Sequence, residues 1–342
     1  MRTCLLIILF FAPPEDTGAA NGYDIQPVPK TTINLDEIPA TPFNPEMLQL
    51  EIKGFTSREG KILAIGEVMR HDGFLFSSYP QYDLVARYSV DNRQTIFIGP
   101  QNHGGNTVPL KNPGQLRLIN ETLSITCRSN GQVFVTNLDG ELINYDMIAD
   151  FQNPFPAPSF PIDSESGKPR YLIINHHDNH LMKRINPRGR SIVSYGFGPD
   201  ERTRQSDPMD WSFRGTGLVT ENWEVIFISF SGTRLLHFDS KGSVIQRIFF
   251  ESSGFKHSSS LPIRPGYETT PLPLDPIKGV QYDNGTYWVL LEINSHSHLL
   301  SVNGKEKKLF VLGKNWNGIH FEHPHLTLYD RHSGHIRSYK LK

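Results

Sequence analysis

The stretch FLFSSYPQYDLVARYSVDN, residues 74–92, decides the fold because its pattern returns along the whole chain. It consists of an apolar segment, a polar turn, a second segment that opens on two apolar residues, and a closing turn with Asp, Asn or Gly. Short apolar segments bounded by turn residues are typical of β-strands. The stretch therefore predicts two consecutive strands joined by a polar turn.

Five further copies of this pattern follow. Self-similarity at a regular spacing is the sequence signature of repeat architectures. The copies cover residues 133–146, 171–190, 225–242, 286–304 and, in shortened form, 326–342. The segments LVARYSVDN (84–92) and LMKRINPRG (181–189) have the same length and the same order of apolar and polar positions. Each such segment is interpreted as the third strand of a four-stranded unit.

The links between repeats also share a pattern: a glycine, a polar loop, a proline and a new apolar strand. These links cover residues 95–119, 191–211 and 308–328. Pro113, Pro208 and Pro324 each stand just ahead of an apolar strand, where the missing N–H costs no ladder hydrogen bond. Each link therefore leads from the fourth strand of one unit into the next unit.

Six repeats of four short strands, about 40 to 60 residues apart, predict an all-β fold. The expected fold is a six-bladed β-propeller of four-stranded antiparallel blades, spanning residues 48–342. The last repeat lacks an outer strand. The alternating segment LQLEIKGF, residues 48–55, can supply it. An N-terminal strand would then join the C-terminal blade and close the ring.

The glycine–loop–proline links and the hairpins resemble those of NHL-like and TolB-like six-bladed propellers of secreted or periplasmic bacterial proteins. The resemblance covers residues 48–342 and implies the fold. It does not imply a function, because such propellers include enzymes and protein-binding modules.

The N-terminus has a different composition. Arg2, the apolar run of residues 4–12 and the small residues Ala19 and Ala20 resemble a secretory signal peptide. The run is too short to span a bilayer, which needs about 20 apolar residues. We expect a signal peptide at 1–20, an extended segment at 21–47, and a secreted or periplasmic location at the cell envelope. The alternative is a ragged hydrophobic terminus, since Glu15 and Asp16 are unusual near a cleavage site.

Composition limits the partners and the chemistry. The net charge is −1 and charged residues make up 20%, so we expect no nucleic-acid partner, no transmembrane segment and a monomer. Removal of the signal peptide would take Cys4 away and leave Cys127 alone, so no disulfide is expected. Cys127 lies in a strand-like run, which favours a small buried apolar residue over a nucleophile.

The densest histidine cluster, HHDNH at residues 176–180, is expected in the turn between a second and a third strand. NSHSH (294–298) and RHSGH (331–335) occupy the corresponding turns, which places His180, His298 and His335 at equivalent positions just before a third strand. Turns of different blades lie too far apart for a shared metal ion, whose ligands must come within about 2 Å. Three interpretations stay open: a local metal site, a ligand-contacting turn and a solvated turn. The candidate residues are His176, His177, Asp178 and His180.

Two links supply the other candidate binding residues. HFEHPH (320–325), beside NWNG (315–318), is expected in a link near the central channel; its candidates are Trp316, His320, Glu322 and His323. The link at residues 198–217 holds Arg202, Asp210, Trp211 and Arg214. Trp and Arg are favoured anchors at binding surfaces. The alternative for both links is a solvated or salt-bridged loop, with Trp211 capping a blade.

Common catalytic motifs are absent from the sequence: it has no G-x-S-x-G elbow, no H-E-x-x-H and no phosphate loop. We therefore expect a binding protein without a cofactor, which takes a protein, peptide or glycan ligand through its loop face. The alternative is a hydrolase or lyase with a single Zn²⁺ or Ca²⁺ ion in the central channel. The two differ in whether His103, His176, His257, His320 or nearby carboxylates converge on the axis.

Overall fold

The structure is a computed structural model that describes residues 30–103, 106–119, 121–127, 131–147, 159–162, 170–174, 180–185, 191–197, 215–220, 224–229, 233–256 and 276–341. These residues are almost all in strands or tight turns, as the composition predicts. Their helical elements are two short 3₁₀ helices, η1 (Leu35–Glu37) and η2 (Pro80–Tyr82). The expected signal peptide at residues 1–20 lies outside the described residues.

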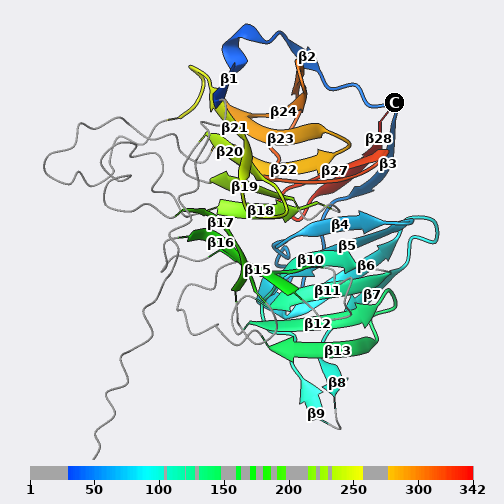
Figure 1. Ribbon diagram of the computed structural model, residues 1–342. Coiled ribbons are helices and arrows are strands. Elements are labelled where there is room, and N and C mark those ends of the chain that lie inside the picture. Colours follow the sequence, from blue (N-terminus) through cyan, green and yellow to red (C-terminus); the bar gives the residue numbers. More distant parts are fainter. Residues whose placement is uncertain are drawn as a thin grey trace, which may run out of the picture.

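The strands of the described residues form six small sheets and one hairpin (Figure 1). The first sheet contains β4 (Val68–His71), β5 (Phe74–Tyr79), β6 (Leu84–Ser89) and β7 (Thr95–Ile98). The second contains β10 (Pro113–Ile119), β11 (Thr122–Cys127), β12 (Gln132–Asn137) and β13 (Leu142–Met147). The third contains β14 (Ser159–Ile162), β15 (Arg170–Ile174), β16 (His180–Ile185) and β17 (Ser191–Phe197).

The second half of the chain continues the series. The fourth sheet contains β18 (Gly215–Val219), β19 (Val225–Ser229), β20 (Arg234–Phe238) and β21 (Val244–Glu251). The fifth contains β22 (Ile277–Asp283), β23 (Thr286–Ile293), β24 (His296–Asn303) and β25 (Glu306–Val311). The sixth contains β26 (Gly318–Glu322), β27 (His325–Tyr329), β28 (Ile336–Lys340) and the N-terminal β3 (Met47–Ile52). The hairpin of β8 (Gln101–His103) and β9 (Asn106–Val108) follows the first sheet.

The first strand of each sheet contacts the first strand of at least one neighbouring sheet. Contacts join β4 to β10, β10 to β14, β18 to β22, β22 to β26, and β26 back to β4. We call β4, β10, β14, β18, β22 and β26 the inner strands. Residues far apart in the sequence are therefore brought close together along the inner strands.

The N-terminal segment runs along the outer strands of three sheets. β1 (Lys30–Asn34) pairs in parallel with β21, and β2 (Ala40–Pro42) pairs in parallel with β25. β3 then pairs antiparallel with β28. The fourth and fifth sheets consequently have five strands instead of the expected four, because this segment covers their outer edges. The side chains of Ile33 and Leu35 anchor the N-terminal segment, because they are buried in the core with Ile248 and Phe250.

The repeats of the sequence correspond to these sheets, but one repeat is displaced by a whole strand. Five of the six copies coincide with a second and a third strand, such as β5 and β6 for residues 74–92. Residues 133–146 instead form β12 and β13, the third and fourth strands of the second sheet. The assignment of residues 133–146 to a second and a third strand was wrong because their turn resembles those of the other repeats. That turn contains Asp139 and Gly140, and Gly140 has a φ of +89°.

The core lies between adjacent sheets. One cluster joins Val68 and Leu75 of the first sheet to Tyr329 and Ile336 of the sixth. Cys127 is fully buried in the cluster between the first and second sheets, and burial raises the pKa of its thiol to about 12. The prediction of a buried, apolar cysteine is confirmed, since a thiol with this pKa stays protonated at neutral pH.

We expect the variant Ile52→Ala to lower the free energy of unfolding by about 3 kcal/mol, because it leaves a cavity between the first and sixth sheets. Ile52 is 8% exposed, whereas Leu48 on the same strand is 45% exposed. Leu48→Ala is therefore the matched control and should change stability by less than about 0.5 kcal/mol. Urea denaturation followed by circular dichroism measures both. Equal losses for the two variants would contradict the packing role of Ile52.

Candidate functional site

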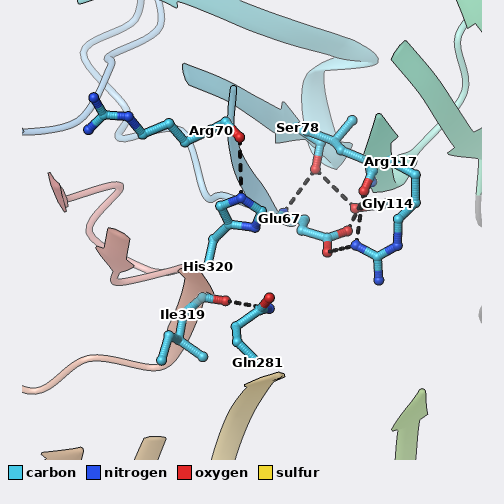
Figure 2. Close-up of polar contacts among 9 residues, drawn as sticks. Glu67, Arg70, Ser78, Gly114, Arg117, Gln281, Ile319 and His320 are labelled. Carbon is cyan, nitrogen blue, oxygen red and sulfur yellow. Dashed lines mark hydrogen bonds and ion pairs between the residues drawn. The ribbon is translucent and has the colours of Figure 1, made fainter. Parts of the chain in front are cut away.

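Four polar side chains meet at the inner strands of four sheets. Glu67 directly precedes β4, Arg117 lies on β10, Gln281 on β22 and His320 on β26, and Figure 2 shows these side chains around one region. All four are partly exposed. We call them the inner-strand cluster. They come from the first, second, fifth and sixth sheets, so the fold, and not local sequence, brings them together.

Glu67 is held at both its backbone and its carboxylate. Its backbone N–H donates to the hydroxyl of the buried Ser78 (2.9 Å), and that hydroxyl donates to the carbonyl oxygen of Gly114 (3.1 Å). Its Oε2 accepts the backbone N–H of Leu116 at 2.9 Å, while Oε1 lies 3.4 Å from Nη1 of Arg117. These bonds fix the carboxylate between the first and second sheets (Figure 2).

Close packing explains the glycine before this carboxylate. A Cβ added to Gly66 would lie 2.7 Å from Oγ of Ser78 and 2.8 Å from Cγ of Pro80. Such contacts are too short for any side chain to be accommodated. Gly66 therefore lets the chain pass close to β5, which brings Glu67 within reach of β10.

His320 is a neutral imidazole with a defined tautomer. Its Nε2 lies 3.3 Å from the carbonyl oxygen of Arg70, and a carbonyl oxygen can only accept, so Nε2 carries the proton. Burial, aided by the positive charges of Arg117, Arg70 and His71, lowers the pKa of His320 to about 4. At neutral pH its Nδ1 is thus an unprotonated acceptor, and it has no hydrogen-bond partner among the described residues.

The orientation of Gln281 is also fixed by a hydrogen bond to a backbone carbonyl oxygen. Its side-chain nitrogen donates to the carbonyl oxygen of Ile319 at 3.2 Å, which fixes the amide with the nitrogen toward β26. Its Oε1 is then left as an acceptor. Gln281 bridges the fifth and sixth sheets, as His320 bridges the sixth and first, so both side chains use their donors on a neighbouring inner strand.

A second cation stands near the cluster. The guanidinium of Arg331, in the turn between β27 and β28, lies 5.9 Å from the ring centre of the buried Tyr329. Tyr329 and, more weakly, Glu67 raise the pKa of Arg331 against the opposing effect of burial. Arg117, 3.4 Å from the carboxylate of Glu67, and Arg331, whose carbonyl oxygen accepts the N–H of Ile65, are therefore the two permanent positive charges that act on Glu67.

The far ends of β4 and β26 carry a separate hydrogen-bonded group of polar side chains. Nδ1 of His71 lies 2.7 Å from Oε1 of Glu322, and its Nε2 lies 3.3 Å from Oδ2 of Asp72. Burial raises the pKa of Glu322, while His71 opposes that shift. Arg70 adds a hydrogen bond to Ser338 of β28. These contacts tie the first sheet to the sixth and leave Glu322 paired.

The structure corrects the expected position of HFEHPH. Residues 318–322 form the inner strand β26, and Pro324 lies in the turn between β26 and β27, so His320 and Glu322 are not link residues. The physical reason is the alternation of buried or packed Ile319 and Phe321 with His320 and Glu322, which is strand periodicity. His323 lies exposed in the turn, with its ring centre 6.4 Å from that of Phe321.

Trp316 does lie in a link, but its side chain belongs to the core. It is 4% exposed and packs with Leu290 and Ile319. Its backbone N–H donates to Oγ of Ser297 at 2.7 Å, and that hydroxyl donates back to its carbonyl oxygen at 3.1 Å. A ligand-binding role for Trp316 stays a prediction, and its burial leaves little surface for it.

Most of the other predicted residues cannot be placed. His176, His177, Asp178, Arg202, Asp210, Trp211, Arg214 and also His257 lie outside the described residues. His180 begins strand β16, and His103 lies on the β8–β9 hairpin, which projects away from the inner strands (Figure 1). His298 lies within β24 and not in a turn, because Asn294 and Ser295, both with positive φ, complete the turn two residues earlier.

The sequence did not single out Glu67, Arg117, Gln281 or Arg331. Each is one polar residue in an otherwise ordinary segment, and no spacing relates them. Only an assignment of every inner strand, with its register, could have found them. In the described part of the chain, no three His, Cys, Asp or Glu side chains are grouped as metal ligands. That part also contains no helix with the length and apolar character needed to cross a membrane.

No protein-family model matches the chain, and no curated protein matches it in sequence. Several solved structures resemble it. A candidate exported protein from Bacteroides fragilis matches with a TM-score of 0.56 and 8% identity, over 92% of this chain and 100% of that one. A member of the DUF4221 family from Bacteroides vulgatus matches with a TM-score of 0.51 and 10% identity, over 86% and 97%. Virginiamycin B lyase from Staphylococcus aureus matches with a TM-score of 0.50 and 10% identity, over 86% and 99%.

At this identity the likeness establishes the fold alone. The similar structures are β-propellers, and the small antiparallel sheets of this chain have the same architecture. The sequence-based expectation of an all-β propeller is therefore confirmed at that level.

Stability should fall on acidification through the His320 side chain. Its pKa is about 4 in the folded protein, below the ordinary value of 6.5, so the unfolded chain binds more protons between these values. Folding is then weakened as the pH falls from 6.5 toward 4. Between pH 7 and pH 5, the wild type should lose about 2 kcal/mol more than His320→Gln, whose side chain does not titrate.

Urea denaturation at the two pH values measures this difference. The control His296→Gln removes an exposed histidine of the fifth sheet and should lose as much stability as the wild type. A His320→Gln variant with the pH dependence of the wild type would show that the folded protein does not lower the pKa of His320.

Proposed function

We propose that the protein is an exported, six-bladed β-propeller that binds a protein, peptide or glycan ligand through its loop face, at the inner-strand cluster. The six sheets of the described residues would be its blades. Support for a closed ring comes from β3, which pairs with β28, and from β26, which contacts β4. We also propose kinship with the NHL-like and TolB-like propellers, on the basis of the links and hairpins. Export is supported by the signal-like N-terminus.

The main support for a binding function is that the four side chains of the inner-strand cluster come together from different sheets. Glu67, Arg117, Gln281 and His320 reach one region from four different sheets, and each is partly exposed. Binding sites of propellers and other repeat folds are built from single residues of several units. The side chains are held by hydrogen bonds to neighbouring inner strands, so a ligand would meet a largely preorganised set of polar groups.

The same geometry favours binding over catalysis. A general base works best when its pKa lies near the working pH, whereas the pKa of His320 is about 4. The carboxylate of Glu67 is engaged by Leu116 and Arg117. His320 is therefore a weak proton acceptor at neutral pH, although it can accept a hydrogen bond.

Arg331→Gln should weaken the binding of a ligand at this site by about tenfold, because it removes a charged donor at the edge of the cluster. Arg58→Gln, in an exposed loop, is the control and should leave affinity unchanged. Saturation-transfer NMR with a panel of peptides and of neutral and acidic oligosaccharides identifies the probes that bind. Titration then gives their affinities. Unchanged affinity of Arg331→Gln would contradict the proposed location.

Two further readouts separate binding from the hydrolase or lyase alternative. Probes recovered after incubation should be chemically unchanged by mass spectrometry. Elemental analysis of protein purified without added metal or a His-tag should find far less than one equivalent of zinc or calcium. A full equivalent retained through dialysis, together with cleaved probe, would favour the metal-dependent enzyme.

A further inference from the structure

We propose that the inner-strand cluster recognises the hydroxyl groups of a neutral glycan. This inference rests on the proposed function and selects one of its three ligand classes. It follows from which atoms of the cluster are already used inside the protein and which are left for a ligand.

The first step concerns Gln281 and His320. Both donate their available N–H toward acceptor-only backbone oxygens, those of Ile319 and Arg70. Because these partners cannot donate, neither side chain can reverse its orientation without losing its bond. Oε1 of Gln281 and Nδ1 of His320 are consequently left as acceptors. A ligand that binds to Oε1 of Gln281 and Nδ1 of His320 must therefore supply the hydrogen-bond donors.

The second step concerns charge. Glu67 adds a third acceptor, and Nη1 of Arg117 lies 3.4 Å from its Oε1. The backbone of Arg331 lies nearby, since its carbonyl oxygen accepts the N–H of Ile65 at 2.8 Å, and the charge of Glu67 acts on Arg331. The local charge of these three groups is positive by one, which disfavours an ammonium donor. An ionised carboxylate group accepts hydrogen bonds but cannot donate them, so it would face Gln281 and His320 with nothing to donate. A neutral ligand that both donates and accepts fits the whole set.

Sugars fit these groups better than peptides do. Each sugar hydroxyl donates one hydrogen bond and accepts others. A sugar can therefore donate to the acceptors of the cluster and accept from its arginines. Peptide ligands are usually anchored by apolar or aromatic side chains in pockets, or by pairing with a sheet edge. All members of the inner-strand cluster are polar, and the inner strands lie between neighbouring sheets and away from the outer edges. A neutral glycan is the class that these groups fit best.

The test uses the full protein and defined probes: neutral oligosaccharides and immobilised glucan, mannan, galactan and xylan, with polygalacturonate and a set of peptides as other classes. At least one neutral glycan should bind. Gln281→Met and His320→Leu remove one acceptor each and should weaken that binding by about fivefold or more. Gln94→Met, which removes an exposed glutamine of the first sheet, is the matched control and should bind like the wild type.

A second measurement avoids reliance on variants that fold poorly. In wild-type protein, the ¹⁵N resonance of Nδ1 in His320 should shift when the glycan is added, because Nδ1 then accepts a hydrogen bond. The resonances of the exposed His296 should not shift.

The outcomes distinguish this inference from the proposed function. If only peptides or polygalacturonate bind, and the cluster variants weaken that binding, the proposed function stands and the glycan inference is wrong. If a neutral glycan binds but neither the variants nor the His320 resonance respond, the site is elsewhere and the inference is also wrong. If no probe of any class binds, both proposals fail.

Discussion

The rest of the structure depends on one constraint: the first, fourth, fifth and sixth sheets have buried apolar side chains on both of their faces. In β5, Leu75 packs toward the sixth sheet and Phe76 toward the second. In β23, Leu291 packs toward the fourth sheet, whereas Leu290 packs toward the sixth. A sheet of this kind is covered only when it stands between two others, because a solvent-facing side would expose its apolar residues. The sheets therefore pack in series, and the first and sixth sheets cover each other.

This packing determines where the polar groups can lie. With both faces and, for the fourth and fifth sheets, the outer edge occupied, the inner strands are where side chains of several sheets meet. Gln281, His320 and Glu67 each bond to the backbone of the next inner strand. The same bonds that join neighbouring sheets orient the groups that a ligand would contact. The bonds that orient the candidate site are thus the same bonds that join neighbouring sheets.

Several features were predictable from the chain because they depend on local pattern. The strands of residues 74–92 and 286–304 form where the apolar segments and turn residues indicate them. Residues 48–52 of the alternating segment 48–55 lie in β3, which pairs with β28, the last strand of the chain. Cys127 is buried, as expected for a lone cysteine in an apolar run. The second repeat was shifted by one strand, because an Asp-Gly turn between β12 and β13 looks the same as a turn between β11 and β12 would.

The candidate site was predictable only in part. His320 stood out because histidines are dense at residues 320–325, yet it was assigned to a link, since GIHFE is too short to distinguish a strand from a loop by composition. Glu67, Arg117 and Gln281 carried no signal, because one polar residue in a strand has no periodicity of its own. By itself, the sequence determined the class of fold, the positions of most repeated strands and the burial of Cys127, all of which follow from local alternation and turn chemistry. Only the tertiary structure decided which polar residues meet, because that depends on how separate sheets pack and in which register their inner strands approach one another.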